Sequence, residues 1–104
     1  MDTLSYRKAN ELVGNYANEA ALEASLLGPS MFFEGDALLA YMGADMQAQM
    51  DGQELERGKA YHIPARTTVT FGMARNGVRA YIAVAGGLDL RIVLVDMQHG
   101  QSSL

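Results

Sequence analysis

Apolar and polar positions fall into short runs along the chain, and glycine or another turn-forming residue separates most of these runs. The most apolar run, residues 81–85, carries no charge and is rich in aromatic and β-branched side chains, which is typical of a buried strand. At residues 46–50, methionine and alanine alternate with glutamine, and this period of two predicts a half-buried strand. Further strands are predicted at residues 30–34, 37–42, 61–63 and 67–71.

Two dipeptides, Asp51-Gly52 and Asn76-Gly77, are of the kind that favours two-residue hairpin turns. The first is predicted to join residues 46–50 to a return strand, and the second to lead into the buried strand. Short strands with repeated turn signals predict a mainly β fold, in the form of a closed or nearly closed barrel.

The N-terminal segment has a different pattern, which predicts one helix of about three turns. Asp2 or Thr3 can cap its start, and Gly14 suits its end because glycine tolerates the left-handed conformation. Residues 20–27 suit either a further helix, since alanine, leucine and glutamate favour one, or a strand. The apolar residues expected to share roughly one face of this helix are Leu4, Ala9, Leu12 and Val13.

The composition is that of one folded domain, with 104 residues of which 49% are apolar and 19% charged. A formal net charge of −4 argues against nucleic acid as a partner, because such binding usually requires a basic face. Cysteine is absent, so disulfides and thiolate ligands are excluded, and no ligand spacing indicates a metal site. With no secretory signal and no run of membrane-spanning length, we expect a cytoplasmic location without membrane contact.

The first candidate site is Gly43-Ala44-Asp45, which follows the apolar run at residues 37–42. A glycine turn at the end of a strand can present backbone amides to a ligand. Asp45 can then accept a hydrogen bond from a substrate amide or act as a base. The alternative is a turn aspartate whose carboxylate binds its own backbone.

The second candidate site is Gly86-Gly87 with Asp89, directly after the buried strand. Paired glycines permit positive φ and the close approach of another group. The alternative is an ordinary strand end. The pair lacks the further glycine and the lysine of a phosphate-binding loop, so we do not expect this chain to bind ATP itself.

Four stretches, in order, resemble one family, the biotin-dependent carboxyltransferase-like proteins, which includes KipA, the C subunit of 5-oxoprolinase and allophanate hydrolase subunit 2. RAYIAVAGGLDL at residues 79–90 resembles a central segment of that family. The other three are MDTLSYRKANELVGN at 1–15, ALEASLLGP at 21–29 and GADMQAQMDGQEL at 43–55. The resemblance therefore extends over nearly the whole chain up to about Leu94.

The resemblance implies a cyclophilin-like β-barrel lobe with one N-terminal helix, and it favours a strand at residues 20–27. Family chains are considerably longer and contain two such lobes. Residues 1–94 are expected to form part of the first lobe, and residues 95–104 a divergent polar tail. The sequence departs from the family in lacking a preceding strand with a Thr-Val-Gln-Asp-x-Gly-Arg motif and the Gly-Ser-Arg step that usually follows Asp89.

In function, the resemblance implies a part of the C subunit of 5-oxoprolinase, which acts with a KipI-like partner (the B subunit) and an ATP-using partner (the A subunit). That assembly opens the lactam of 5-oxoproline to glutamate. Larger relatives transfer a carboxyl group between biotin and urea, so ATP on the partner or biotin is implied, and no cofactor is expected on this chain. The implied catalytic residue is Asp45, and the implied residues for binding an amide or lactam substrate are Gly43, Ala44, Gly86, Gly87 and Asp89.

The alternative function is a non-catalytic regulatory or protein-interaction module of the KipA type. Since the second lobe and the arginine motif are missing, the chain alone is expected to be inactive as an enzyme. An uncovered apolar face and a free strand edge favour a homodimer, with the β-prone run at residues 92–95 as the pairing strand.

Overall fold

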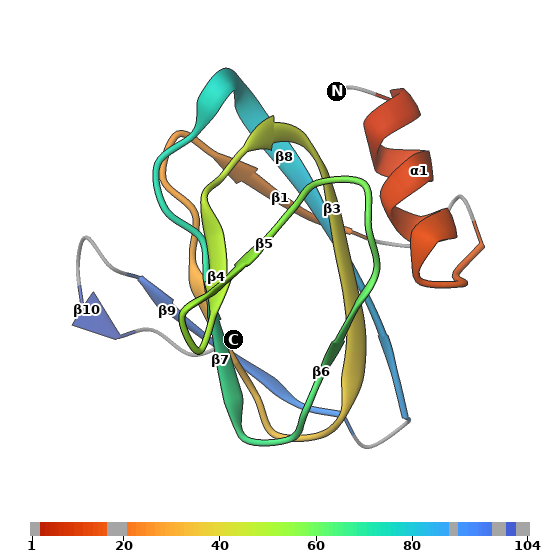
Figure 1. The fold of residues 1–104 in the computed structure, drawn as a ribbon, viewed down its shortest axis with the longest axis vertical. Coiled ribbons are helices and arrows are strands. Elements are labelled where there is room, and N and C mark those ends of the chain that lie inside the picture. The colour runs from red at the N-terminus through yellow and green to blue at the C-terminus, as the bar shows by residue number, and fades with distance from the viewer. Residues whose placement is uncertain (1–2, 17–20, 88–89, 97–99, 102–104) are drawn as a thin grey trace.

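The computed structural model describes residues 3–16, 21–87, 90–96 and 100–101, and it consists mainly of short antiparallel strands (Figure 1). The single helix of this part of the chain, α1, covers Thr3–Leu12. The strands are β1 (Leu22–Ser25), β2 (Ser30–Phe33), β3 (Ala37–Asp45), β4 (Ala48–Met50), β5 (Gln53–Leu55), β6 (Tyr61–Ile63), β7 (Thr67–Thr70), β8 (Arg75–Gly86), β9 (Ile92–Asp96) and β10 (Gly100–Gln101).

The strands form two sheets, a four-stranded sheet in the order β1-β8-β3-β6 and a six-stranded sheet in the order β10-β9-β2-β7-β4-β5. The predicted mainly β fold with an N-terminal helix is confirmed, and the predicted buried strand is the middle of β8. No strand ladder closes the two sheets into one barrel within the part of the chain that the structure describes. In place of a closed barrel, the described strands form two facing sheets.

The main core lies between the two sheets and contains most of the large apolar side chains. Tyr41 from β3 and Phe71, which directly follows β7, meet edge to face there, with ring centroids 5.3 Å apart. A smaller core joins α1 to the outer face of the four-stranded sheet through Ala9, Val13, Ala40 and Ala83. The molecule thus has three layers, in which α1 covers one face of β3 and β8.

The predicted helix is confirmed; α1 ends at Leu12, and Gly14, two residues further on, has a φ of +84°. Ala9 and Val13 are buried, but Leu4 is 82% exposed, so the prediction that Leu4 shares a face with Ala9 and Val13 is wrong. At about 100° per residue, the nine positions between Leu4 and Val13 turn the helix through two and a half turns. The two side chains therefore point in opposite directions.

One of the two predicted hairpins is confirmed. Asp51 and Gly52 have φ angles of 50° and 81°, and they connect β4 to β5 with Met50 paired to Gln53. Positive φ at both positions is the requirement of a type I′ turn. Asn76-Gly77 does not form a hairpin, because β7 and β8 belong to different sheets and these residues lie inside β8.

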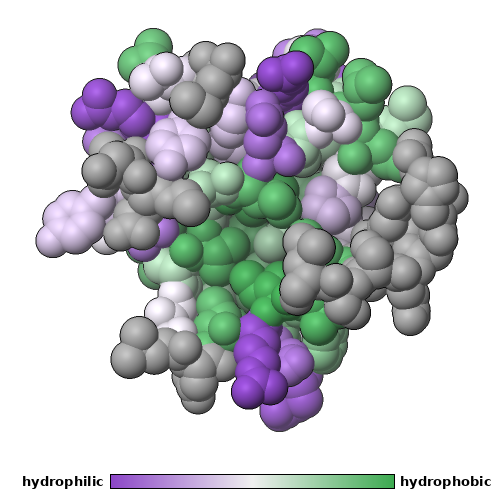
Figure 2. Space-filling model, turned by 180° about the vertical axis from the view of Figure 1, so that it is seen from behind, coloured by the Kyte–Doolittle hydropathy of each residue, from purple (hydrophilic) through white to green (hydrophobic). Residues whose placement is uncertain are grey.

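The face of the molecule opposite to the view of Figure 1 has an apolar centre. Apolar side chains gather there over β1, β8 and β9 (Figure 2). β1 forms one edge of its sheet, with β8 as its partner and no described strand on its other side. The run at 92–95 forms most of β9, which pairs with β2 along residues 92–95 and with β10 only at Val95 and Asp96, so its role in pairing two copies stays a prediction. β9 also crosses the predicted boundary at residue 94.

Candidate functional site

The candidate site is built on an irregularity in the ladder between β3 and β8. The ladder is regular from the pair Ala37–Gly86 to the pair Gly43–Ala80, and the next pair is Asp45–Arg75. Between these last two pairs β3 advances by two residues (43 to 45) and β8 by five (75 to 80), so β8 contains three extra residues. β3 therefore does not end at Gly43, as the sequence suggested, but continues past a bulge.

Glycine permits this bulge at two points. Gly43 has a φ of +103°, and a Cβ there would lie 2.6 Å from the carbonyl oxygen of Arg79. Gly77 has a φ of +142°, and its Cβ would lie 3.2 Å from that of Ala44. Asn76 adds a further positive φ, 58°. Only residues without a side chain allow the two backbones to approach this closely.

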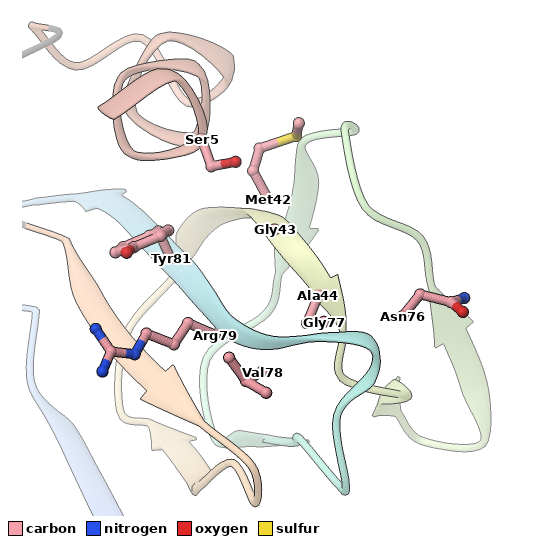
Figure 3. Close-up of a pocket in the computed structure, with 9 residues that line it drawn as sticks. All are labelled: Ser5, Met42, Gly43, Ala44, Asn76, Gly77, Val78, Arg79 and Tyr81. Carbon is pink, nitrogen blue, oxygen red and sulfur yellow. The ribbon is translucent and has the colours of Figure 1, made fainter. Parts of the chain in front are cut away.

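The bulge forms one wall of a cavity of about 480 Å³, which we call the bulge groove (Figure 3). The first turn of α1 forms the facing wall, where Ser5 lies opposite Met42 of β3. Arg79 extends away from Asn76 toward β1, where its guanidinium lies 3.4 Å from the carboxylate of Glu23. The lining residues are Ser5, Met42, Gly43, Ala44, Asn76, Gly77, Val78, Arg79 and Tyr81.

Asp45 lies beside the bulge groove but is not one of its lining residues, and its carboxylate already has protein partners. Its Oδ1 accepts hydrogen bonds from the backbone N–H of Gln47 at 2.9 Å and from the Tyr41 hydroxyl at 3.4 Å. Its Oδ2 lies 3.2 Å from the Arg75 guanidinium. The bond from its own backbone two residues on is the geometry of the turn-aspartate alternative. The catalytic role of Asp45 stays a prediction.

The same contacts set the protonation of Asp45. The pKa of its carboxyl group is lowered, first by the hydrogen bond from the Gln47 N–H and also by the charges of Arg75 and Arg57. The carboxylate is therefore ionised at neutral pH and is a weak proton acceptor. It faces a smaller polar cavity of about 240 Å³ that it shares with Glu54, Leu55, Glu56 and Arg57.

Three side chains that the sequence did not single out contact Gly43 or Asp45, the β3 residues on either side of the irregularity. Arg57 donates a hydrogen bond of 2.7 Å to the carbonyl oxygen of Gly43, and Arg75 pairs with Asp45. The single proton of the Tyr41 hydroxyl is shared between Asp45 and the carbonyl oxygen of Leu55, each 3.4 Å away, and burial is the largest cause of the raised pKa of Tyr41. The sequence offers one signal for this group, since Tyr41 and Asp45 are four residues apart in one extended run. Arg57 and Arg75 reach this group only because the fold brings together residues that are distant in sequence.

The structure does not bring the two candidate sites together. Gly43 pairs with Ala80, while Gly86 pairs with Ala37 at the other end of the same ladder. Six residues of β3 separate these pairs, which is about 20 Å at roughly 3.3 Å per residue. Gly86 has a packing reason of its own, because a Cβ there would lie 2.5 Å from the side chain of Leu90.

Gly87 is exposed, and its carbonyl accepts a hydrogen bond from the Leu90 N–H at 3.0 Å. Asp89 lies outside the described residues. Over those residues, no group of three or more histidine, aspartate or glutamate side chains is placed to hold a metal ion. No helix in the same ranges is long and apolar enough to cross a membrane.

Comparison with known proteins gives one consistent family. A family model described as the carboxyltransferase domain, subdomain A and B, matches residues 1–95. Urea amidolyase of Saccharomyces cerevisiae is 36% identical over 90 residues, which are 86% of this chain and 5% of the yeast protein. The C subunit of 5-oxoprolinase from Escherichia coli K12 is 37% identical over 94 residues, which are 90% of this chain and 30% of that protein.

Solved structures agree with these matches. The crystal structure of TTHA0988 superposes with a TM-score of 0.78 at 39% identity, over 86% of this chain and 18% of the other. The urea amidolyase of K. lactis superposes with a TM-score of 0.79 at 29% identity, over 84% of this chain and 5% of the other. The chain thus spans less than a third of each of these relatives. It belongs to the carboxyltransferase domain family, subdomain A and B, together with urea amidolyase and the C subunit of 5-oxoprolinase.

Proposed function

We propose that this chain is part of a cytoplasmic 5-oxoprolinase, in its C subunit, where it forms one wall of the substrate site. In this proposal residues 1–94 belong to the first lobe and residues 95–104 to a divergent tail. The reaction is the ATP-dependent opening of 5-oxoproline to glutamate, together with a KipI-like partner and an ATP-using partner. The observation that carries the proposal is the bulge groove, because it lies at the Gly43-Ala44-Asp45 stretch that resembles the family.

The chemistry of lactam opening explains why such a groove is suitable. Attack on the lactam carbon places negative charge on the carbonyl oxygen, and backbone N–H groups fixed in position stabilise that charge. The extra residues of β8 and the side-chain-free Gly43 and Gly77 bring backbone close to the groove. ATP belongs to the partner in this scheme, and biotin enters none of its steps.

Within this proposal Asp45 acts as a positioning residue rather than as a base. Its ionised carboxylate is not part of the groove lining and joins Gln47, Tyr41 and Arg75. Arg57 and Asp45 together fix the backbone on either side of Ala44. The second candidate pair, Gly86-Gly87, is not included, because a molecule as small as 5-oxoproline cannot span about 20 Å.

A chimera tests this function. The 94 aligned residues of the E. coli 5-oxoprolinase protein would be replaced by those of this chain, and ATP-dependent glutamate formation would be measured with the other E. coli subunits. Val78→Trp should fill the bulge groove and abolish activity. Leu38→Trp is the matched control, because Leu38 is also an exposed apolar residue (40%) but is not one of the groove-lining residues.

Two outcomes would contradict the proposal. A folded chimera that assembles with the other subunits but forms no glutamate would exclude the 5-oxoprolinase assignment. Equal activity of the Val78→Trp and Leu38→Trp chimeras would exclude the bulge groove as the substrate site.

A non-catalytic binding module of the KipA type is the second candidate, and a separate observation favours it. Leu26 and Met73 are each 65% exposed and Val78 is 58% exposed. They gather at one end of the molecule, since the Leu26 N–H binds the Val78 carbonyl at 2.9 Å and Leu27 bridges to Met73. Exposed apolar groups of this kind often mark protein contacts. Binding of a KipI-like protein that Met73→Asp abolishes, without any enzymatic turnover, would support this candidate.

A further inference from the structure

A second groove runs along α1 and is separate from the bulge groove, although the two adjoin at Ser5 and Met42. It has a volume of about 550 Å³, and we call it the α1 groove. Met42 of β3 lies at its base, and the helix provides its other lining. The residues concerned are Leu4, Ser5, Arg7, Lys8, Glu11 and Met42.

The α1 groove carries positive charge in a chain that is acidic as a whole. Arg7 and Lys8 line it with a single acid, Glu11, while the chain has a formal net charge of −4. No ion pair of Arg7 or Lys8 is seen among the described residues. Both side chains are exposed, so their charges face the solvent at the rim of the groove. A ligand of negative charge is therefore the complementary one.

The groove also presents apolar surface next to these charges. Leu4 is 82% exposed, more than any other large apolar side chain of the described residues. Its position on the helix turns it away from the core, so packing among the described residues does not account for a leucine there. Met42 adds a half-buried apolar surface below it. The complementary ligand thus needs an apolar group as well as carboxylates.

We propose that the α1 groove docks a short acidic segment of a partner protein, with carboxylates on Arg7 and Lys8 and one apolar side chain against Leu4 and Met42. From Leu4 to Glu11 the helix rises by about 10 Å, which matches about three residues of extended chain. The two basic residues are too few for firm binding to an anionic membrane, which requires a larger basic cluster. This inference does not depend on the proposed enzymatic function.

The probe for this site is a fluorescein-labelled synthetic peptide in which glutamate and leucine alternate, and a lysine-leucine peptide is its charge-reversed counterpart. Fluorescence anisotropy with the 104-residue chain should detect binding of the acidic peptide only, and the affinity should fall as salt rises. Amide shifts in NMR spectra should concentrate at Leu4, Lys8 and Met42.

Matched variants distinguish the effect of charges in the α1 groove from the effect of the net charge of the chain. Arg7→Glu with Lys8→Glu should weaken binding by at least about tenfold. Arg66→Glu with Arg91→Glu changes the net charge equally at exposed positions outside the groove, and it should leave binding nearly unchanged. Leu4→Ser should also weaken binding, and since it changes no charge and removes no buried contact it serves as the second test if the double reversal fails to fold.

Several results would overturn the proposal: no binding by the unaltered chain, equal binding of both peptides, or equal effects of the two double reversals. Unchanged affinity in Leu4→Ser would exclude the apolar part of the site. If free glutarate produced the same shifts with comparable affinity, the groove would be a site for small anions and the peptide assignment would be wrong.

Discussion

Replacing Gly43 by alanine is the most direct test of the bulge. Two separate penalties are expected. The φ of +103° disfavours any residue with a side chain, at a cost of about 1 kcal/mol. In addition, a Cβ would lie 2.6 Å from the Arg79 carbonyl oxygen and 3.1 Å from the Cα of Ala80. Because both atoms belong to the backbone of the central strand, neither can move without disturbing its ladder.

The size of the effect follows from these contacts. Backbone displacement in a packed region costs about 1–3 kcal/mol, so the sum for Gly43→Ala is about 2–4 kcal/mol. A domain of this size has a free energy of unfolding of about 5–15 kcal/mol, and each kcal/mol lowers its Tm by about 4 °C. We therefore expect the Tm to fall by about 8–16 °C.

Gly52→Ala is the control for this measurement. Gly52 also has positive φ, +81°, but a Cβ there meets nothing within 4 Å. It should therefore suffer only the conformational penalty of about 1 kcal/mol. Urea and thermal unfolding followed by circular dichroism would measure both variants. Equal losses in Gly43→Ala and Gly52→Ala would refute the argument that the close approach of β3 and β8 at Gly43 requires glycine.

Three further predictions concern Asp45, assembly and activity. Since the folded-state pKa of Asp45 is lowered, its contribution to stability is present above its unfolded-state pKa, about 3.9, and is lost as the pH falls through the folded value. Asp45→Asn should cost about 0.5–1 kcal/mol at neutral pH, and its urea midpoint should fall less between pH 5 and pH 3 than that of the unaltered chain. An identical fall in both proteins would contradict this. In the described part of the chain β1 has a strand on one side only, and two copies should pair along its other edge. Light scattering at micromolar concentration should then give a dimer mass, whereas a monomer mass would rule this out. The chain alone should not convert 5-oxoproline to glutamate with ATP, and product above a no-protein control would show otherwise.

The features predicted well from the sequence are those that local chemistry decides. The Asp51-Gly52 hairpin needs only two residues that tolerate positive φ between two short strands. The buried middle of β8 needs only an uncharged β-branched run. Asn76-Gly77 has the same local chemistry as Asp51-Gly52, yet it forms a bulge. Positive φ is suitable for both a hairpin turn and a bulge. Which of the two forms depends on whether the flanking segments pair with each other, as β4 and β5 do, or one of them pairs with a distant strand, as β8 does with β3.

The arginine contacts of the site are beyond sequence reasoning for a similar reason. Arg75 is 30 positions from Asp45, and Arg57 is 14 positions from Gly43. Neither spacing has a meaning in a helix or a strand. These contacts exist because β8 returns beside β3 and because the segment after β5 brings Arg57 to the Gly43 carbonyl. Only the pairing of strands distant in sequence brings the partners together.

The separation of the two glycine sites, in contrast, follows from a topological rule. Gly43 and Gly86 each lie toward the C-terminal end of a strand, and those strands, β3 and β8, are antiparallel neighbours. In antiparallel neighbours the two C-terminal ends lie at opposite ends of the ladder. A site at Gly43 must therefore draw its second wall from the start of β8 and not from its end. That is where residues 76–79 line the bulge groove, so the residues that accompany Gly43 follow from strand direction once the pairing is known.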